Sequence, residues 1–182
     1  IPPFPGVSGS VSKHTLCFSI LTAFRSSILA SFHVELQLQP QLRLGRHSVP
    51  AFIPLERLAR KFLPRDLRAF LELLCAHLNG FMGRRHQLEQ LQERFPDCLV
   101  GAPHGNSLCN LLSFRYRVPG KNRELPEFRA RLLYRDPCRT LPSDVTVTCA
   151  SDSAAAAAHT ELFRRLDLPG AFESMKSLEL RP

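Results

Sequence analysis

The feature that most constrains the fold is a change of hydrophobic period that occurs twice in the same order. Alternating apolar residues, typical of strands, occupy 16–38 and return over 112–149. Between them, apolar residues at three-and-four spacing from Leu55 to Phe95 predict helix, interrupted or restarted at Pro64, and a second helical stripe closes the chain. Strands followed by helices indicate an α+β fold whose helices cover one face of an antiparallel sheet.

Each alternating run predicts a β-meander of about three strands. Turn residues separate the strands, and Asp152 or Ser153 is suited to cap the closing helix. The apolar positions that define the strand faces are Leu16, Phe18 and Ile20, then Phe32, Val34, Leu36 and Leu38, then Leu42 and Leu44 in the first run, and Leu112, Phe114, Tyr116 and Val118, then Phe128, Ala130, Leu132 and Tyr134, then Val145, Val147 and Cys149 in the second.

The repeated order predicts two units with a boundary inside the long helix near Gly83. We expect 15–83 to hold the first unit with the start of the connecting helix, and 84–180 to hold the second. Residues 1–14 are rich in Pro, Ser and Gly without periodicity, so they are predicted to be a linker or tail. The chain begins at Ile1 rather than Met, which indicates a fragment or a processed chain.

The sequence gives no positive signal for catalysis, a cofactor or a metal. It contains neither GxGxxG nor GxxxxGK[ST], the loops that cradle phosphate, and no HExxH. Cys98, His104 and Cys109 have spacings that match no common zinc pattern, and no CxxC occurs among the six cysteines, which fits a reducing compartment. No run approaches the ~20 apolar residues of a membrane helix. We therefore expect a soluble protein that is not an enzyme and works by binding other proteins.

A basic sheet face is the strongest physical indication of a binding surface. The net charge is +8, which favours an acidic partner. Arg115 and Arg117 share one side of a predicted strand, Arg129 and Arg131 share one side of its hairpin partner, and cross-strand neighbours lie ~5 Å apart. One interpretation is a docking surface for acidic protein or phosphate backbone. The other is that long arginine stems cover an otherwise apolar face.

The long helix carries a second basic candidate directly after Gly83. Arg84 and Arg85 are suited to meet acidic groups of a partner. Charge runs on helices are more often solvated faces, so a purely structural role stays open for both residues.

Three segments resemble the centromere protein O family of kinetochore subunits. The resemblance runs from about Thr15 to Leu178 in consistent order. The segments are HSVPAFIPLE at 47–56, LCNLLSF at 108–114, and ARLLY at 130–134 continuing through LPSDVTVTC at 141–149.

The resemblance implies a fold of tandem RWD domains, each a β-meander with helices packed on one face. It also implies a non-enzymatic structural subunit of the inner kinetochore in the nucleus, paired with centromere protein P and docked on centromere proteins Q and U, with R nearby. The segment 49–54 is similar to the RWD turn motif YPxxxP, with Val49 where Tyr is usual. Direct binding of centromeric DNA or a nucleosome through the basic sheet face is the alternative. The residues predicted to contact a partner or DNA are Arg84, Arg85, Arg115, Arg117, Arg129 and Arg131.

Overall fold

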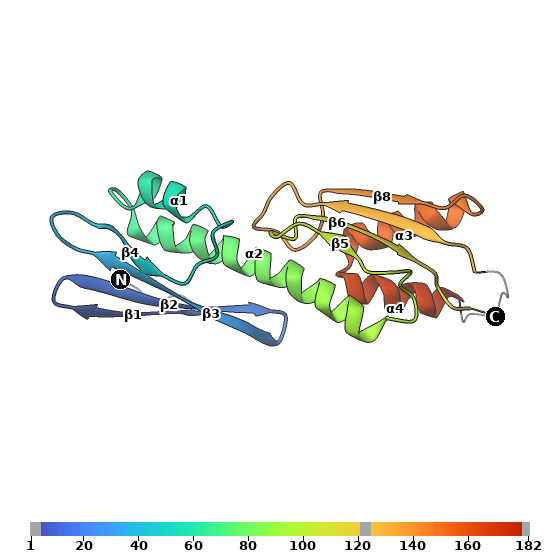
Figure 1. Ribbon diagram of the computed structural model, residues 1–182, viewed down its shortest axis with the longest axis horizontal. Helices are drawn as coiled ribbons and strands as arrows, with labels where there is room; N and C mark the ends of the chain where they lie inside the picture. The colour runs from blue at the N-terminus through green and yellow to red at the C-terminus, as the bar shows by residue number, and fades with distance from the viewer. Residues whose placement is uncertain (1–4, 121–124, 180–182) are drawn as a thin grey trace. The chain divides into compact units, whose positions relative to one another are not determined.

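Two four-stranded antiparallel sheets, each with its strands in sequence order, organise the chain in the computed structural model (Figure 1). The structure describes residues 5–120 and 125–179. The first sheet contains β1 (Val7–Ser12), β2 (Thr15–Phe24), β3 (Ser27–Gln37) and β4 (Arg43–His47), and the second contains β5 (His104–Gly105), β6 (Leu111–Tyr116), β7 (Phe128–Leu133) and β8 (Asp144–Thr148). The helices are α1 (Leu55–Phe62), α2 (Leu67–Arg94), α3 (Ser153–Arg165) and α4 (Leu168–Glu179).

The contacts divide the chain into two units, 1–82 and 83–182. The long helix α2 contributes its first part to one unit and its last part to the other. Pro64 lies between α1 and α2, where the sequence predicts an interruption. The predicted α+β fold with two β-meander units is confirmed.

The first unit folds around the apolar faces of β2 and β3. Phe18, Ile20 and Val34 are each at most 5% exposed. The turn between these strands places Arg25 at a φ of 54°, the left-handed conformation found in tight turns. α1 and α2 cover one face of the sheet (Figure 1), and Leu74 of α2 is completely buried. One face is therefore core, and none of the described helices covers the other face.

The interpretation of 1–14 as a linker or tail is wrong for residues 7–12, which form β1. This strand pairs along its length with β2, from Val7 opposite Ile20 to Ser12 opposite Thr15. Its sequence, VSGSVS, has almost no buried side chain, so hydrophobic alternation could not identify it. Backbone hydrogen bonding to a neighbouring strand holds it in place. Residues 1–4 lie outside the described part of the chain.

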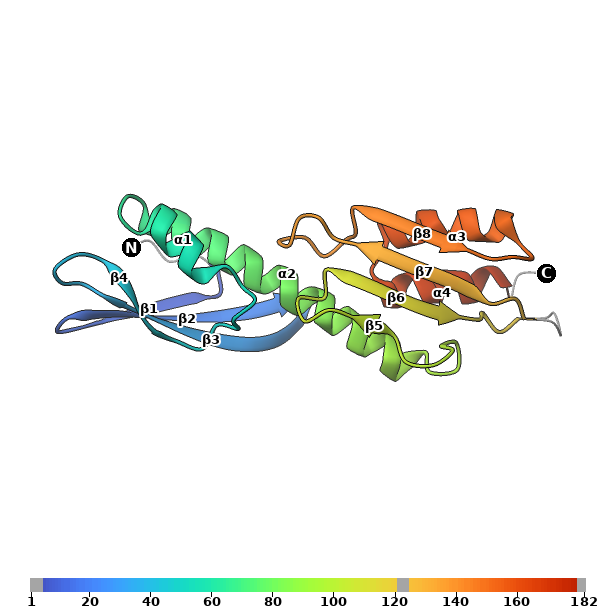
Figure 2. The ribbon, with the colours of Figure 1, turned by 45° about the horizontal axis from the view of Figure 1, so that its top comes forward.

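The second unit repeats the layer order with a richer aromatic core. Phe114 and Tyr116 of β6 contact Phe163 of α3 and Phe172 of α4, with ring centroids between 5.1 and 6.1 Å apart. Both helices lie on one face of the second sheet (Figure 2). α3 begins as predicted, because the carboxylate of Asp152 accepts a hydrogen bond from the backbone N–H of Ala155 at 2.9 Å.

Candidate interaction surfaces

The outer face of the second sheet carries three of the predicted arginines side by side. In the register of β6 and β7, Arg115 is directly opposite Arg129, and Ser113 is opposite Arg131. All three guanidinium side chains are exposed, whereas Ala130 between them points into the core. The alternation of the sequence thus places these arginines on the face away from α3 and α4.

A shallow hollow of about 420 Å³ lies over these arginines. Arg115 approaches the loop beside it, since a Cβ on Gly101 would lie 3.7 Å from its guanidinium. Arg115 also pairs with the carboxylate of Glu127 at 3.6 Å, and 49% of the Arg115 side chain remains exposed. No ion pair joins Arg129 or Arg131 to a carboxylate within 5–120 and 125–179. The hollow is lined by Val100, Gly101, Ala102, His104, Ser113, Phe114, Arg115, Arg129, Ala130, Arg131, Thr146 and Thr148.

Arg117 and Arg85 lie apart from this cluster. Arg117 follows the end of β6, where its backbone N–H donates to the carbonyl of Cys98 at 2.8 Å and its side chain is exposed. Arg85 pairs with Glu89 one turn later on α2, at 3.0 Å, with both side chains about half exposed. Exposed pairs of this kind contribute little to stability. Because the side chains of Arg85 and Arg117 reach solvent, both are accessible to a partner.

Arg84 is not a surface residue, and its place among the predicted contact residues is wrong. Its side chain is 0% exposed. The guanidinium donates to the carbonyls of Cys109 at 3.2 Å, Leu108 at 3.0 Å, Pro137 at 2.6 Å and Arg139 at 2.9 Å. Burial lowers the pKa of Arg84, but an arginine keeps its charge in a protein. Arg84 therefore ties α2 to two loops of the second unit.

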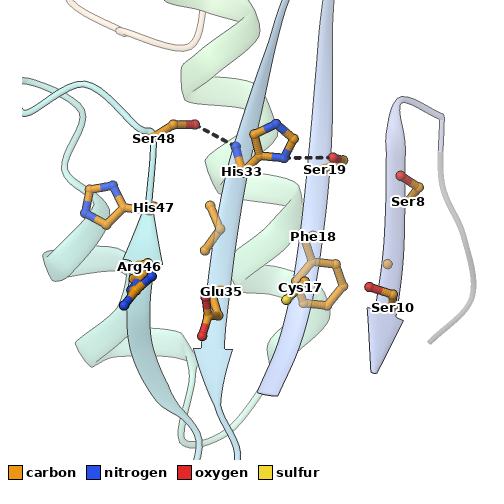
Figure 3. Close-up of a pocket in the computed structure, with 12 residues that line it drawn as sticks. Ser8, Ser10, Cys17, Phe18, Ser19, His33, Glu35, Arg46, His47 and Ser48 are labelled. Carbon is orange, nitrogen blue, oxygen red and sulfur yellow. Dashed lines mark hydrogen bonds between the residues drawn. The ribbon is translucent and has the colours of Figure 1, made fainter. Parts of the chain in front are cut away.

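The outer face of the first sheet has a different chemistry (Figure 3). Ser8 and Ser10 of β1 lie beside Cys17 and Ser19 of β2, and larger polar side chains follow on β3 and β4. These small side chains leave a hollow of about 460 Å³. It is lined by Ser8, Gly9, Ser10, Cys17, Phe18, Ser19, His33, Val34, Glu35, Arg46, His47 and Ser48.

One hydroxyl–imidazole pair on this face resembles part of a nucleophilic catalytic site. The hydroxyl of Ser19 lies 3.0 Å from Nδ1 of His33, and the backbone N–H of His33 donates to the hydroxyl of Ser48 at 2.7 Å. A nucleophilic site also needs a group that orients the imidazole and donors for an oxyanion. Within the described residues no carboxylate bonds to this ring. The pair is an exposed cross-strand hydrogen bond.

Two of the cysteines have thiols of low reactivity. Burial raises the pKa of Cys98 and of Cys75 to about 11, with neighbouring Asp97 and Glu72 adding to the effect. A thiol with a raised pKa is a poor nucleophile and a poor metal ligand. In the part of the chain that the structure describes, no three His, Cys, Asp or Glu residues gather to hold a metal ion, and no helix is long and apolar enough to cross a membrane.

The fold and these surfaces define a protein of two β-meander units, each exposing a polar sheet face. A model of the family described as Cenp-O kinetochore centromere component matches residues 8–118. The chain is 43% identical over 175 residues to centromere protein O of Gallus gallus, covering 93% of this chain and 54% of that protein. It is 47% identical over 146 residues to centromere protein O of Homo sapiens, covering 80% of this chain and 48% of that protein.

The chain therefore belongs to the Cenp-O kinetochore centromere component family. The resemblance predicted from the three sequence segments is confirmed. The chain spans about half the length of the curated relatives it matches.

Proposed function

We propose that the chain is a non-enzymatic structural subunit of the kinetochore, located at the centromere in the nucleus. The observation that carries this proposal is family membership over most of the chain. The surfaces support it, since both sheets present exposed polar side chains suited to binding another macromolecule. A subunit of this kind acts through the partners that it holds together.

The finer proposal is a heterodimer with centromere protein P, formed through RWD-type units, that docks on centromere proteins Q and U with R nearby. Exposed apolar side chains on the first unit support a protein interface. Val11 is 73% exposed, Ile28 is 71% exposed and Leu21 is 43% exposed. Large exposed apolar groups are costly in water, and stable interfaces remove such groups from solvent.

Size-exclusion chromatography with light scattering tests the pairing. The chain is co-expressed with centromere protein P and compared with the chain alone. A stable one-to-one complex is expected. A variant with Leu21 and Ile28, which share the exposed face of β2 and β3, replaced by Ser should form a weaker complex if these side chains lie in the interface. A chain that elutes as a monomer and ignores its partner would overturn the pairing.

A second candidate function, direct binding of centromeric DNA, rests on the arginine cluster of the second sheet. Arg115, Arg129 and Arg131 form a basic surface of the kind that meets phosphate. Binding to a DNA duplex would then weaken steeply with salt, because each neutralised phosphate releases counterions. Replacing Arg129 and Arg131 with Gln should reduce the salt dependence. Replacing Arg164 and Arg165, which lie on α3 on the other side of this sheet, is the matched control.

A further inference from the structure

A groove lies between β4 and α1 in the first unit, distinct from the two hollows over the sheet faces. It has a volume of about 500 Å³. The residues that line it are Leu42, Arg43, Leu44, Gly45, His47, Glu56, Ala59, Arg60, Leu63 and Pro64. Family membership assigns no role to this groove, and the groove is separate from the basic face of the second sheet.

The groove lies where the last strand of the first sheet meets α1. Residues 42–45 and 47 form its strand wall, and residues of α1 with the two that follow it form the other wall. Among the strands of residues 5–120 and 125–179, β4 is the last of its sheet and pairs with β3 alone, its neighbour in Figure 3. Its outer edge therefore carries backbone donors and acceptors, beside the groove, that no other described strand pairs with.

The opposite wall is one stripe of α1. Glu56, Ala59, Arg60 and Leu63 are separated by three, one and three positions, which places them on one side of a helix. Ala59 and Leu63 are at most 8% exposed and form an apolar floor, while Arg60 is exposed at the rim. The groove combines a free strand edge, an apolar floor and a charged rim.

The charge around the groove is strongly positive. β4 and α1 together carry five Lys and Arg side chains and one carboxylate, Glu56. The five cations are Arg43, Arg46, Arg57, Arg60 and Lys61, and all are exposed. None of them forms an ion pair within the described residues. Of the five, Arg43 and Arg60 line the groove, and these two make its rim complementary to carboxylates.

We propose that the groove between β4 and α1 binds an extended, acidic segment of a partner protein, which adds to the free edge of β4. Main-chain hydrogen bonds to a sheet edge supply affinity in this mode of binding, and alternate side chains supply specificity. Apolar side chains of the segment would meet Ala59 and Leu63, and its carboxylates would meet Arg43 and Arg60. The inference stands whichever protein pairs with the chain.

Two other occupants fit the groove less well. A second copy of this chain would bring Arg43 and Arg46 of one edge against the same residues of the other, and like charges placed together across an interface disfavour association. Nucleic acid supplies phosphate for the rim, but it has no peptide backbone to pair with the edge of β4 and no branched aliphatic side chain to pack on the floor. An acidic peptide can pair with the strand edge, pack on the apolar floor and meet the cations of the rim.

The probe is a fluorescent ten-residue peptide that alternates Glu and Val. Its binding to the full chain is followed by fluorescence anisotropy, and hydrogen exchange is measured on the backbone amides of residues 43–47. Binding with slower exchange at these amides is expected. A version of the peptide that is N-methylated along one edge cannot pair with a strand, and we expect it to bind at least about tenfold more weakly. No binding, or unchanged exchange in β4, would overturn the proposal.

Two double variants with the same change of charge separate the groove from general attraction. Arg43→Glu with Arg60→Glu reverses the rim and should weaken the peptide about tenfold. Arg57→Glu with Arg65→Glu alters cations of the same region that do not line the groove, and should change affinity less than about twofold. Equal losses in both variants would contradict the assignment, as would displacement of the peptide by a DNA duplex. Thermal unfolding checks that each variant is folded.

Discussion

The two sheets have the same strand order and opposite kinds of outer surface. The first exposes Ser8, Ser10 and Ser19 with imidazoles beside them, whereas the second exposes Arg129 and Arg131 beside threonines. Both hold apolar side chains on the inner face, where helices cover them. Inner positions are constrained by the core, and outer positions are free to differ. The comparison teaches that the two units, although alike in fold, present different chemistry to a partner.

The helix α2 is also tied to each unit by a different chemistry. In the first unit, the side chain of Asn79 accepts from the backbone N–H of Ala23 at 3.0 Å and donates to the carbonyl of Cys75 at 2.9 Å. In the second unit, the buried Arg84 holds four carbonyls, and Gln87 donates to the carbonyl of Thr140 at 3.0 Å. The second unit therefore depends more heavily on one polar side chain.

The largest effect expected is the loss of Arg84. Arg84→Met removes a guanidinium from four carbonyls that have little access to water, and an unsatisfied buried polar group costs about 1–3 kcal/mol. We expect the second unit to lose about 3–5 kcal/mol of unfolding free energy. Tyrosine fluorescence follows this unit alone, because the chain has two tyrosines, Tyr116 and Tyr134, and no tryptophan. Arg85→Met is the control, and a loss of similar size there would contradict the role of Arg84.

A smaller loss is expected from removing one hydroxyl in the core of the second unit. The hydroxyl of Tyr116 lies 2.9 Å from Nδ1 of His159, and both side chains are buried. Tyr116→Phe keeps the ring and removes this hydrogen bond, so we expect a loss of about 1–2 kcal/mol in chemical denaturation. Tyr134→Phe is the matched variant. An unchanged denaturation midpoint in Tyr116→Phe would show that the hydrogen bond contributes no net stability.

The second unit should also become less stable in mild acid. Burial lowers the pKa of His159, so the folded protein binds a proton less readily than the unfolded chain, whose histidine has a pKa of about 6.5. The free energy of unfolding is then highest above this pH and falls as the pH decreases below it, by at most about 1.4 kcal/mol per pH unit. Denaturation between pH 7.5 and 5 measures the slope. His159→Gln should flatten it, and an unchanged slope would assign it to other groups.

A change at Asn79 should affect only the first unit. Asn79→Ala removes a partly exposed hydrogen bond to β2, so we expect a loss of about 1 kcal/mol. Hydrogen exchange at the amide of Ala23 measures it, because this N–H donates directly to Asn79. The tyrosine signal of the second unit serves as the internal control. Exchange that stays slow at Ala23 would contradict the comparison of the two helix attachments.

The smallest effect on stability is expected at the basic face itself. Arg115 is about half exposed and lies 3.6 Å from Glu127, so Arg115→Gln should change the unfolding free energy by less than about 0.5 kcal/mol. Chemical denaturation followed by tyrosine fluorescence is the measurement. A loss above about 1 kcal/mol would favour the other interpretation of this face, in which arginine stems cover the sheet and support the fold.

The strand faces were predictable because alternation records burial directly. Phe18 and Ile20 in one unit, and Phe114 and Tyr116 in the other, occupy inner positions that the pattern indicates. The pairing of Arg115 with Arg129 follows from the same periodicity. Strands that bury few apolar side chains show no such alternation. β1 has a serine or glycine at most of its positions, and β5 has two residues, so both were missed.

The role of Arg84 could not be predicted because it depends on loops far away in the sequence. On the helix it resembles Arg85, its exposed neighbour. What distinguishes the two is the approach of carbonyls from 108–109 and from 137 and 139. The groove beside β4 was missed for a similar reason, since its walls are a strand edge and a helix that only the tertiary structure brings together.

Cys98 can report when the second unit opens. Its side chain is 1% exposed, and burial raises the pKa of its thiol to about 11, so the folded unit both shields the sulfur and disfavours the thiolate that an alkylating reagent needs. The sulfur should therefore react mainly while its surroundings are open. The alkylation rate of Cys98, resolved from that of the other cysteines by mass spectrometry, would time the opening of the second unit in the intact chain.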